Sequence, residues 1–130
     1  MKTLFQAIYA RFQATALSDS LTDLYFAQAP PKTVFPYGVF SLISNIADWT
    51  FTEDFEDCLI QFSLFSNVMS DQTEICDAFE LLKTAFDKFD LIVGDYRIVS
   101  LERGIANLIK QEDVWHYAVT YRIYLEKIGD

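Results

Sequence analysis

The side chains best suited to catalysis do not combine into a recognisable site. His116 is the only histidine of the chain, and no serine, cysteine or aspartate lies at a spacing typical of a nucleophile–base pair. We therefore interpret it as a surface or hydrogen-bonded histidine of a strand, not as a general base. Acid–base pairs can also form from residues far apart in the sequence, so the pattern favours a protein without catalytic residues and does not exclude an enzyme.

Metal and phosphate sites are not predicted either. Four carboxylates are crowded into one short segment, at Glu53, Asp54, Glu56 and Asp57. The segment lacks the glycine and the alternating ligand positions of a calcium loop. Its neighbours in the chain offer no histidine, and the four glycines are too scattered to form a phosphate-binding loop. The sequence thus implies no cofactor and no metal.

The two cysteines, Cys58 and Cys76, form no CxxC motif. With a single histidine available they do not suggest a zinc site. We interpret them as buried free thiols of a reducing compartment.

Composition limits the class of protein further. A length of 130 residues suits one domain, 1–130, with one core, and a 52% apolar content argues against disorder. The net charge of −9 repels phosphate backbones and anionic lipid, so neither nucleic acid nor a membrane surface is an expected partner. Polar residues interrupt the apolar N-terminus, which argues against a signal peptide, and no run of 18 apolar residues suggests a spanning helix.

Two segments have the periodicity of amphipathic helices. Residues 2–17 place apolar side chains at steps of three and four, and a second stripe follows the capping segment 70–74. That second stripe consists of Ile75, Phe79, Leu82, Phe86 and Phe89. Its members are interpreted as core residues, not as a cofactor-binding face.

Four segments have the pattern of long strands: 36–44, 58–65, 96–102 and 114–125. A short extended piece, 24–26, precedes them, and Gly104 suggests a bulge or bend. Adjacent strand pairs with two helices and no βαβαβ alternation predict an α+β fold. We expect a mostly antiparallel sheet of about four long strands with two helices packed on one face.

The other face of that sheet allows two interpretations. Polar but weakly charged residues such as Gln61, Thr120 and Tyr124 are expected there. Such a face can contact other copies of the chain, or it can simply be open to water, as antiparallel sheets allow. The acidic segment 45–57 also allows two interpretations. It is either a solvated loop or a contact arm, and the second is suggested by Trp49, Phe51 and Phe55, which lie among its carboxylates.

Several segments together resemble one family. They are the helix Leu4–Phe12, the segment Asp23–Pro30, the motif Pro36-Tyr37-Gly38-Val39-Phe40, the strand Asp54–Phe65 and the closing Ala118–Tyr124. Their order resembles the tail-completion proteins of long-tailed phages and prophages, also called tail-terminator or head–tail joining proteins. The resemblance covers nearly the whole chain, and the Pro-Tyr-x-Val-Phe motif is its most specific part.

The resemblance implies a structural protein of the virion tail, present in the host cytoplasm during assembly, without catalytic residues. Its subunits are expected to form a ring of like copies, typically a hexamer, that caps the tail tube and ends its polymerisation. The tail-tube protein and the head-completion or connector protein would be its further partners. A closed ring requires that one patch meets a different patch on the next copy.

We predict that the acidic segment supplies one side of that contact and basic or polar side chains the other. The candidate residues of the acidic side are Asp48, Trp49, Phe51, Glu53, Asp54 and Phe55, and those opposite are Arg97, Arg103, Arg122 and Tyr124. The alternative from another class is a ligand-binding or enzymatic α+β cone. Its aromatic pocket would be lined by Phe62, Trp115, Tyr117 and Tyr121.

Overall fold

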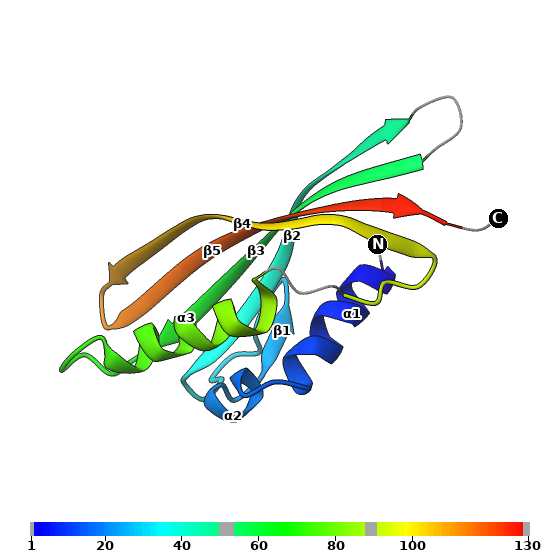
Figure 1. The fold of residues 1–130 in the computed structure, drawn as a ribbon. Coiled ribbons are helices and arrows are strands. Elements are labelled where there is room, and N and C mark those ends of the chain that lie inside the picture. Colours follow the sequence, from blue (N-terminus) through cyan, green and yellow to red (C-terminus); the bar gives the residue numbers. More distant parts are fainter. Residues whose placement is uncertain (1, 50–53, 88–90, 129–130) are drawn as a thin grey trace.

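The protein folds as one curved sheet with its helices on one side (Figure 1). The computed structural model describes residues 2–49, 54–87 and 91–128. The elements in chain order are α1 (Lys2–Gln13), α2 (Leu17–Ser20), β1 (Leu24–Phe26), β2 (Tyr37–Trp49), β3 (Asp54–Ser66), α3 (Thr73–Phe86), β4 (Tyr96–Gln111) and β5 (Val114–Lys127). The predicted α+β class and the predicted order of elements are confirmed, and the four-residue helix α2 is an addition.

The five strands are arranged in the order β1-β2-β3-β5-β4. All long neighbours are antiparallel, and only the three-residue β1 runs parallel to β2. Among the five strands, β3 and β5 carry most of the buried side chains. The predicted bulge near Gly104 is confirmed, because the register between β4 and β5 shifts between Arg103 and Ala106.

The core lies between the helices and one face of the sheet. Alternate residues of β3 (Cys58, Ile60, Phe62, Leu64) and of β5 (Val119, Tyr121, Ile123, Leu125) point towards the helices and are buried. The stripes of α1 and α3 cover them, as their periodicity predicts, with Leu4, Ile8, Phe12, Ile75, Leu82 and Phe86 among the buried residues. Phe89 of the predicted stripe lies outside the described residues. None of the described helices is long and apolar enough to cross a bilayer.

The acidic segment 45–57 is not the solvated loop that was one of its two interpretations. Both strands extend into it, and the hairpin stays in register from Ser44–Leu59 to Trp49–Asp54. Figure 1 shows this end of β2 and β3 projecting beyond the helices. We call residues 46–49 and 54–57 the arm. Acidic residues are poor strand formers in isolation, but here the pairing begins in the buried part of the hairpin and continues outward.

Candidate assembly surface

The face of the sheet that the helices leave uncovered carries a polar cluster at the base of the arm. Arg122 on β5 donates from Nε to Asp57 Oδ1 at 2.9 Å, and its terminal nitrogen pairs with the second oxygen of the same carboxylate. This two-point geometry suits a guanidinium and a carboxylate. It ties β3 to β5 where the arm leaves the body of the protein.

A second contact extends this cluster to β2. The Tyr124 hydroxyl donates to Asp48 Oδ2 at 2.6 Å, and the ring of Tyr124 stacks on Phe55 with centroids 5.2 Å apart. The bond to Asp48, which stabilises the neutral phenol, raises the pKa of Tyr124 to about 12. Three strands are thus held together at the arm by Asp48, Phe55 and Tyr124, three of the predicted interface residues.

The pair of Asp57 and Arg122 gives the first testable prediction. Hydrogen bonding to Arg122 holds the pKa of the Asp57 carboxyl below its ordinary value of about 3.9. A carboxyl with a lowered folded-state pKa contributes stability above its unfolded-state pKa, and this contribution disappears as the pH falls through the folded-state value. Asp57→Asn should therefore lower the urea midpoint at pH 7, and its difference from wild type should shrink below about pH 4.

The loss should be small, because the side chain of Arg122 is 66% exposed and solvent weakens the ion pair. Asp54→Asn, which removes an exposed carboxylate from the same strand, controls for the change in net charge. A difference between wild type and Asp57→Asn that was equal at pH 3 and pH 7 would contradict this account.

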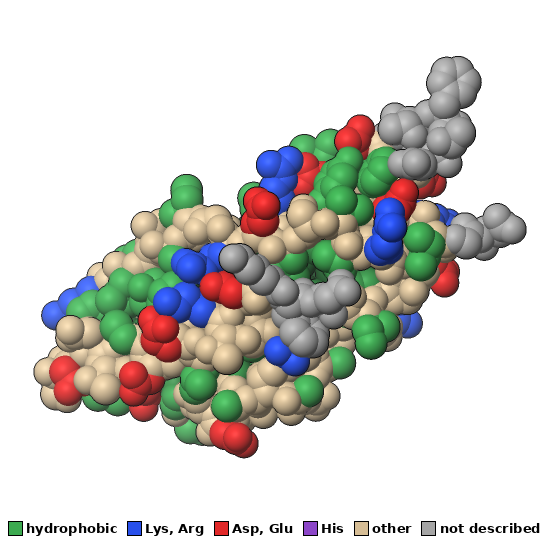
Figure 2. Space-filling model, in the orientation of Figure 1, with side chains coloured by type: hydrophobic (Ala, Val, Ile, Leu, Met, Phe, Trp, Pro, Cys, Tyr) green, Lys and Arg blue, Asp and Glu red, His purple; other side chains and the backbone are tan. Residues whose placement is uncertain are grey.

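All three predicted arginines already have partners within the chain. Arg97 pairs with Glu126, and Arg122 with Asp57. Arg103 lies on the helix side of the sheet, where its Nε is 3.2 Å from Asp87 Oδ1 and its guanidinium lies over the Phe79 ring. The structure therefore divides the predicted basic group between two faces. On the side drawn in Figure 2, basic side chains are scattered among acidic ones.

The remaining predicted residues of the arm are described only in part. Asp54 is exposed and is paired in register with Trp49, whose backbone belongs to β2. Phe51, Glu53 and the side chain of Trp49 lie outside the described part of the structure. Two exposed isoleucines that the sequence analysis did not single out, Ile43 and Ile46, lie on the same strand with exposed fractions of 52% and 61%.

The outer edge of β2 is a further part of this surface. β1 pairs with only three residues of β2, Gly38 to Phe40. Among the described residues, no strand pairs with that edge beyond Phe40, although β2 continues to Trp49. An open edge next to exposed isoleucines is a surface to which another chain can add.

The other end of the uncovered face is aromatic. His116 stacks on Phe65 at 4.6 Å, Phe65 on Tyr37 at 5.0 Å, and Phe35 lies 5.1 Å from Tyr37. Neither ring nitrogen of His116 has a hydrogen-bond partner within the described residues, so the expectation of a hydrogen-bonded histidine is not met, and burial lowers its pKa. These aromatic contacts join β2, β3 and β5. They could not be predicted from the sequence pattern, because that pattern does not show which strands are neighbours.

The potential metal ligands of the described residues do not cluster. No three of their histidine, cysteine, aspartate and glutamate side chains are placed to hold a metal ion. Cys58 and Cys76 are both free, as predicted, but only Cys58 is fully buried, whereas Cys76 is partly buried. Burial raises the pKa of the Cys58 thiol to about 11, which keeps it protonated and unreactive.

The aromatic pocket of the alternative prediction is instead part of the packed core. Phe62 and Tyr121 are each 1% exposed and contact one another and Phe86. Tyr117 stacks on Phe79 at 4.2 Å. Tyr121 donates to Asp87 Oδ1 at 2.5 Å, and its burial raises the pKa of its phenol. These rings therefore pack between the sheet and α3 as part of the core, and Trp115 and Tyr117 are partly buried against it.

Comparison with known proteins finds solved structures with a similar fold. No model of a known family and no curated protein matches the chain. A solved chain described as "Virion of native gene transfer agent (GTA) particle" superposes with a TM-score of 0.74 at 18% identity, over 92% of this chain and 91% of that one. A second solved protein, which carries no functional name, gives a TM-score of 0.60 at 11% identity and covers 96% of both chains. The fold is thus shared with a chain of a phage-like particle over almost its whole length.

Proposed function

We propose that this chain is a tail-terminator protein of a phage or phage-like particle, which caps the tail tube and joins the tail to the head. The observation that supports this most strongly is the likeness to a chain of a gene transfer agent virion, which extends over nine-tenths of both chains. At 18% identity that likeness concerns the fold. The order of sequence motifs described above, which resembles tail-completion proteins, supports the same function independently.

The surface of the molecule fits this role. In its described residues the chain builds a five-stranded sheet, leaves one face and part of one strand edge uncovered, and extends an arm beyond its helices. Exposed isoleucines lie on that arm and near the open edge. These features suit a subunit that contacts several neighbours, and the proposed neighbours are other copies in a hexameric ring, the tail-tube protein below and the connector protein of the head above.

The proposed function is tested by removing the gene from a genome that produces the particle. Tails that lack a terminator are expected to vary in length and to remain separate from filled heads, and electron microscopy of the lysate measures both properties. Expression of the wild-type chain from a plasmid should restore uniform, head-joined tails. Uniform tails joined to heads in the absence of the chain would contradict the proposal.

A further inference from the structure

A groove between α1 and β1 lies outside the assembly surface described above. Its volume is about 570 Å³, within the range of about 300–1,000 Å³ typical of pockets that take ligand-sized groups. It is lined by Lys2, Phe5, Gln6, Tyr9, Ala10, Gln13, Leu24, Tyr25, Phe26 and Phe40. Because β1 is the edge strand of the sheet, the groove opens at the side of the molecule.

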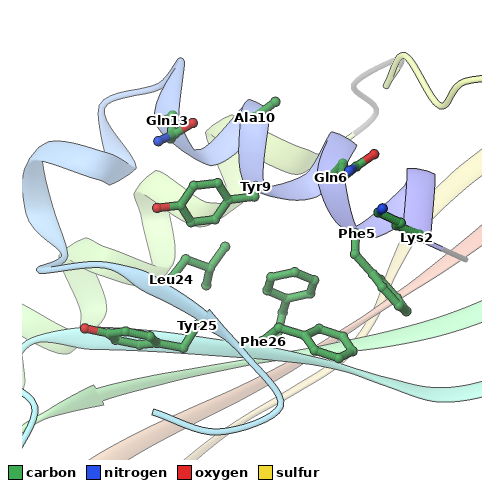
Figure 3. A pocket seen from close by; sticks show the side chains of 10 residues that line it. Lys2, Phe5, Gln6, Tyr9, Ala10, Gln13, Leu24, Tyr25 and Phe26 are labelled. Carbon is green, nitrogen blue, oxygen red and sulfur yellow. The ribbon is translucent and has the colours of Figure 1, made fainter. Parts of the chain in front are cut away.

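Three phenylalanines lie together in the apolar part of this groove. The ring of Phe5 on α1 lies 4.5 Å from that of Phe26 on β1, and Phe26 lies 5.3 Å from Phe40 on β2. Figure 3 shows Phe5 and Phe26 lying between the helix and the strand. Phe26 remains 48% exposed. A large aromatic side chain that is half exposed beside two others is a favourable contact for another apolar group.

Several polar groups beside the groove have hydrogen-bond partners within the chain. The Tyr9 hydroxyl and the Leu24 amide both donate to Asp23 Oδ1 at 2.8 Å. The Phe26 carbonyl accepts a bond from the Gln28 amide at 2.7 Å, and the chain turns away at Ala27, where φ is +66°. These local bonds leave the edge of β1 poorly suited to pairing with an added strand. The groove therefore recognises apolar side chains more readily than an extended backbone.

Charge indicates which apolar segment fits. Of the described residues that line the groove, Lys2 alone is charged, and none is a carboxylate. The arm combines exposed Ile46 with Asp48 and Asp54, and its arginine neighbours are already paired within the chain. An acidic segment with apolar side chains complements an apolar groove with one cation at its rim.

We propose that the α1–β1 groove of one copy receives the arm of a second copy. This inference rests on the proposed function, since it names the partner that the groove would bind in a ring. Each copy carries one arm and one groove, and these are different surfaces. The contact is therefore head-to-tail, which is the arrangement that closes into a ring or continues as a filament.

The test places the photo-crosslinker benzoyl-phenylalanine at Ile46 in the full chain, at concentrations where oligomers form and also with tail tubes added. Crosslinks between copies are expected to reach peptides 2–13 and 24–28, as mass spectrometry identifies. Phe26→Glu should weaken this crosslink about tenfold or more, as expected for a central contact residue. Val34→Glu, which changes an exposed apolar residue outside the groove, is the matched control and should leave it unchanged.

A second variant guards against misfolding of Phe26→Glu. Ala10 is exposed on α1 and lines the groove, so Ala10→Trp should fill the groove, keep the helical circular dichroism and abolish the crosslink. Two outcomes would overturn the groove contact and leave the proposed function intact. One is an oligomer whose crosslinks reach other peptides, and the other is a crosslink that persists in both variants. Capture of a different protein by a crosslinker at Gln13 would also overturn the groove contact. A chain that forms no oligomer even on tail tubes would overturn both.

Discussion

Phe62→Ala is expected to lower the free energy of unfolding by about 3–5 kcal/mol. Phe62 lies at the middle of β3, is 1% exposed, and contacts rings from three other elements. Its centroid lies 4.8 Å from Phe86 on α3, 5.6 Å from Tyr121 on β5 and 6.1 Å from Phe40 on β2. Truncation would leave a cavity among aromatic rings, which cannot move together freely because each is fixed to a different element.

Such a loss is a large part of the total stability, which for a domain is about 5–15 kcal/mol. The measurement is equilibrium unfolding in urea, followed by far-ultraviolet circular dichroism. Ile46→Ala, which truncates a residue 61% exposed on the arm, is the control and should change stability by less than about 0.5 kcal/mol. A loss below about 1 kcal/mol for Phe62→Ala would contradict the description of this ring cluster as the centre of the core.

Gly38→Val is expected to destabilise the protein by about 1–3 kcal/mol through overpacking. A Cβ at position 38 would lie 3.0 Å from Leu24 Cδ1, 3.2 Å from Leu21 Cδ1 and 3.3 Å from Leu64 Cδ2. All three leucines are buried, so the two further methyl groups of valine would push β1 and the end of α2 away from the sheet. This gives a physical reason for a glycine inside the Pro-Tyr-x-Val-Phe motif.

Hydrogen exchange locates the effect of Gly38→Val. The amide of Ala27 bonds to the Phe40 carbonyl at 2.8 Å, and the amide of Gly38 to the Asp23 carbonyl at 3.0 Å. Both bonds join β1 to β2, so these two amides should lose protection before those of β3 and β5 do. Ser41→Val, on the same strand but on the uncovered face opposite Gln61, should be tolerated. Equal stability of Gly38→Val and Ser41→Val would show that the close packing at Gly38 is unimportant.

The sequence predicted the helices and the paired strands because their apolar spacing directly reflects one buried face. It also predicted the bulge near Gly104 from the glycine alone. The close approach of Thr120 explains why position 104 needs a glycine, since a Cβ there would lie 2.8 Å from the Thr120 hydroxyl oxygen. The extended strands of the arm could be missed because acidic residues weaken the strand pattern, and only the pairing with the opposite strand stabilises them.

The contacts of the candidate assembly surface could not be predicted from the sequence for a different reason. Asp57 and Arg122 are 65 positions apart, and they meet only because β5 is placed next to β3. The strand order places β5, and not β4, in that position, and no local pattern specifies this choice. The α1–β1 groove likewise depends on the parallel pairing of β1 with β2. A strand of only three residues is too short for its sequence to predict that pairing.

The role of the chain in a particle is tested most directly by electron cryo-microscopy of intact particles made by a genome that encodes it. We predict a ring of copies with the fold of Figure 1 at the junction between the tail tube and the head, with arms reaching between neighbouring subunits. Particles with complete head–tail junctions in which this fold is absent, or is found only elsewhere, would contradict the assignment.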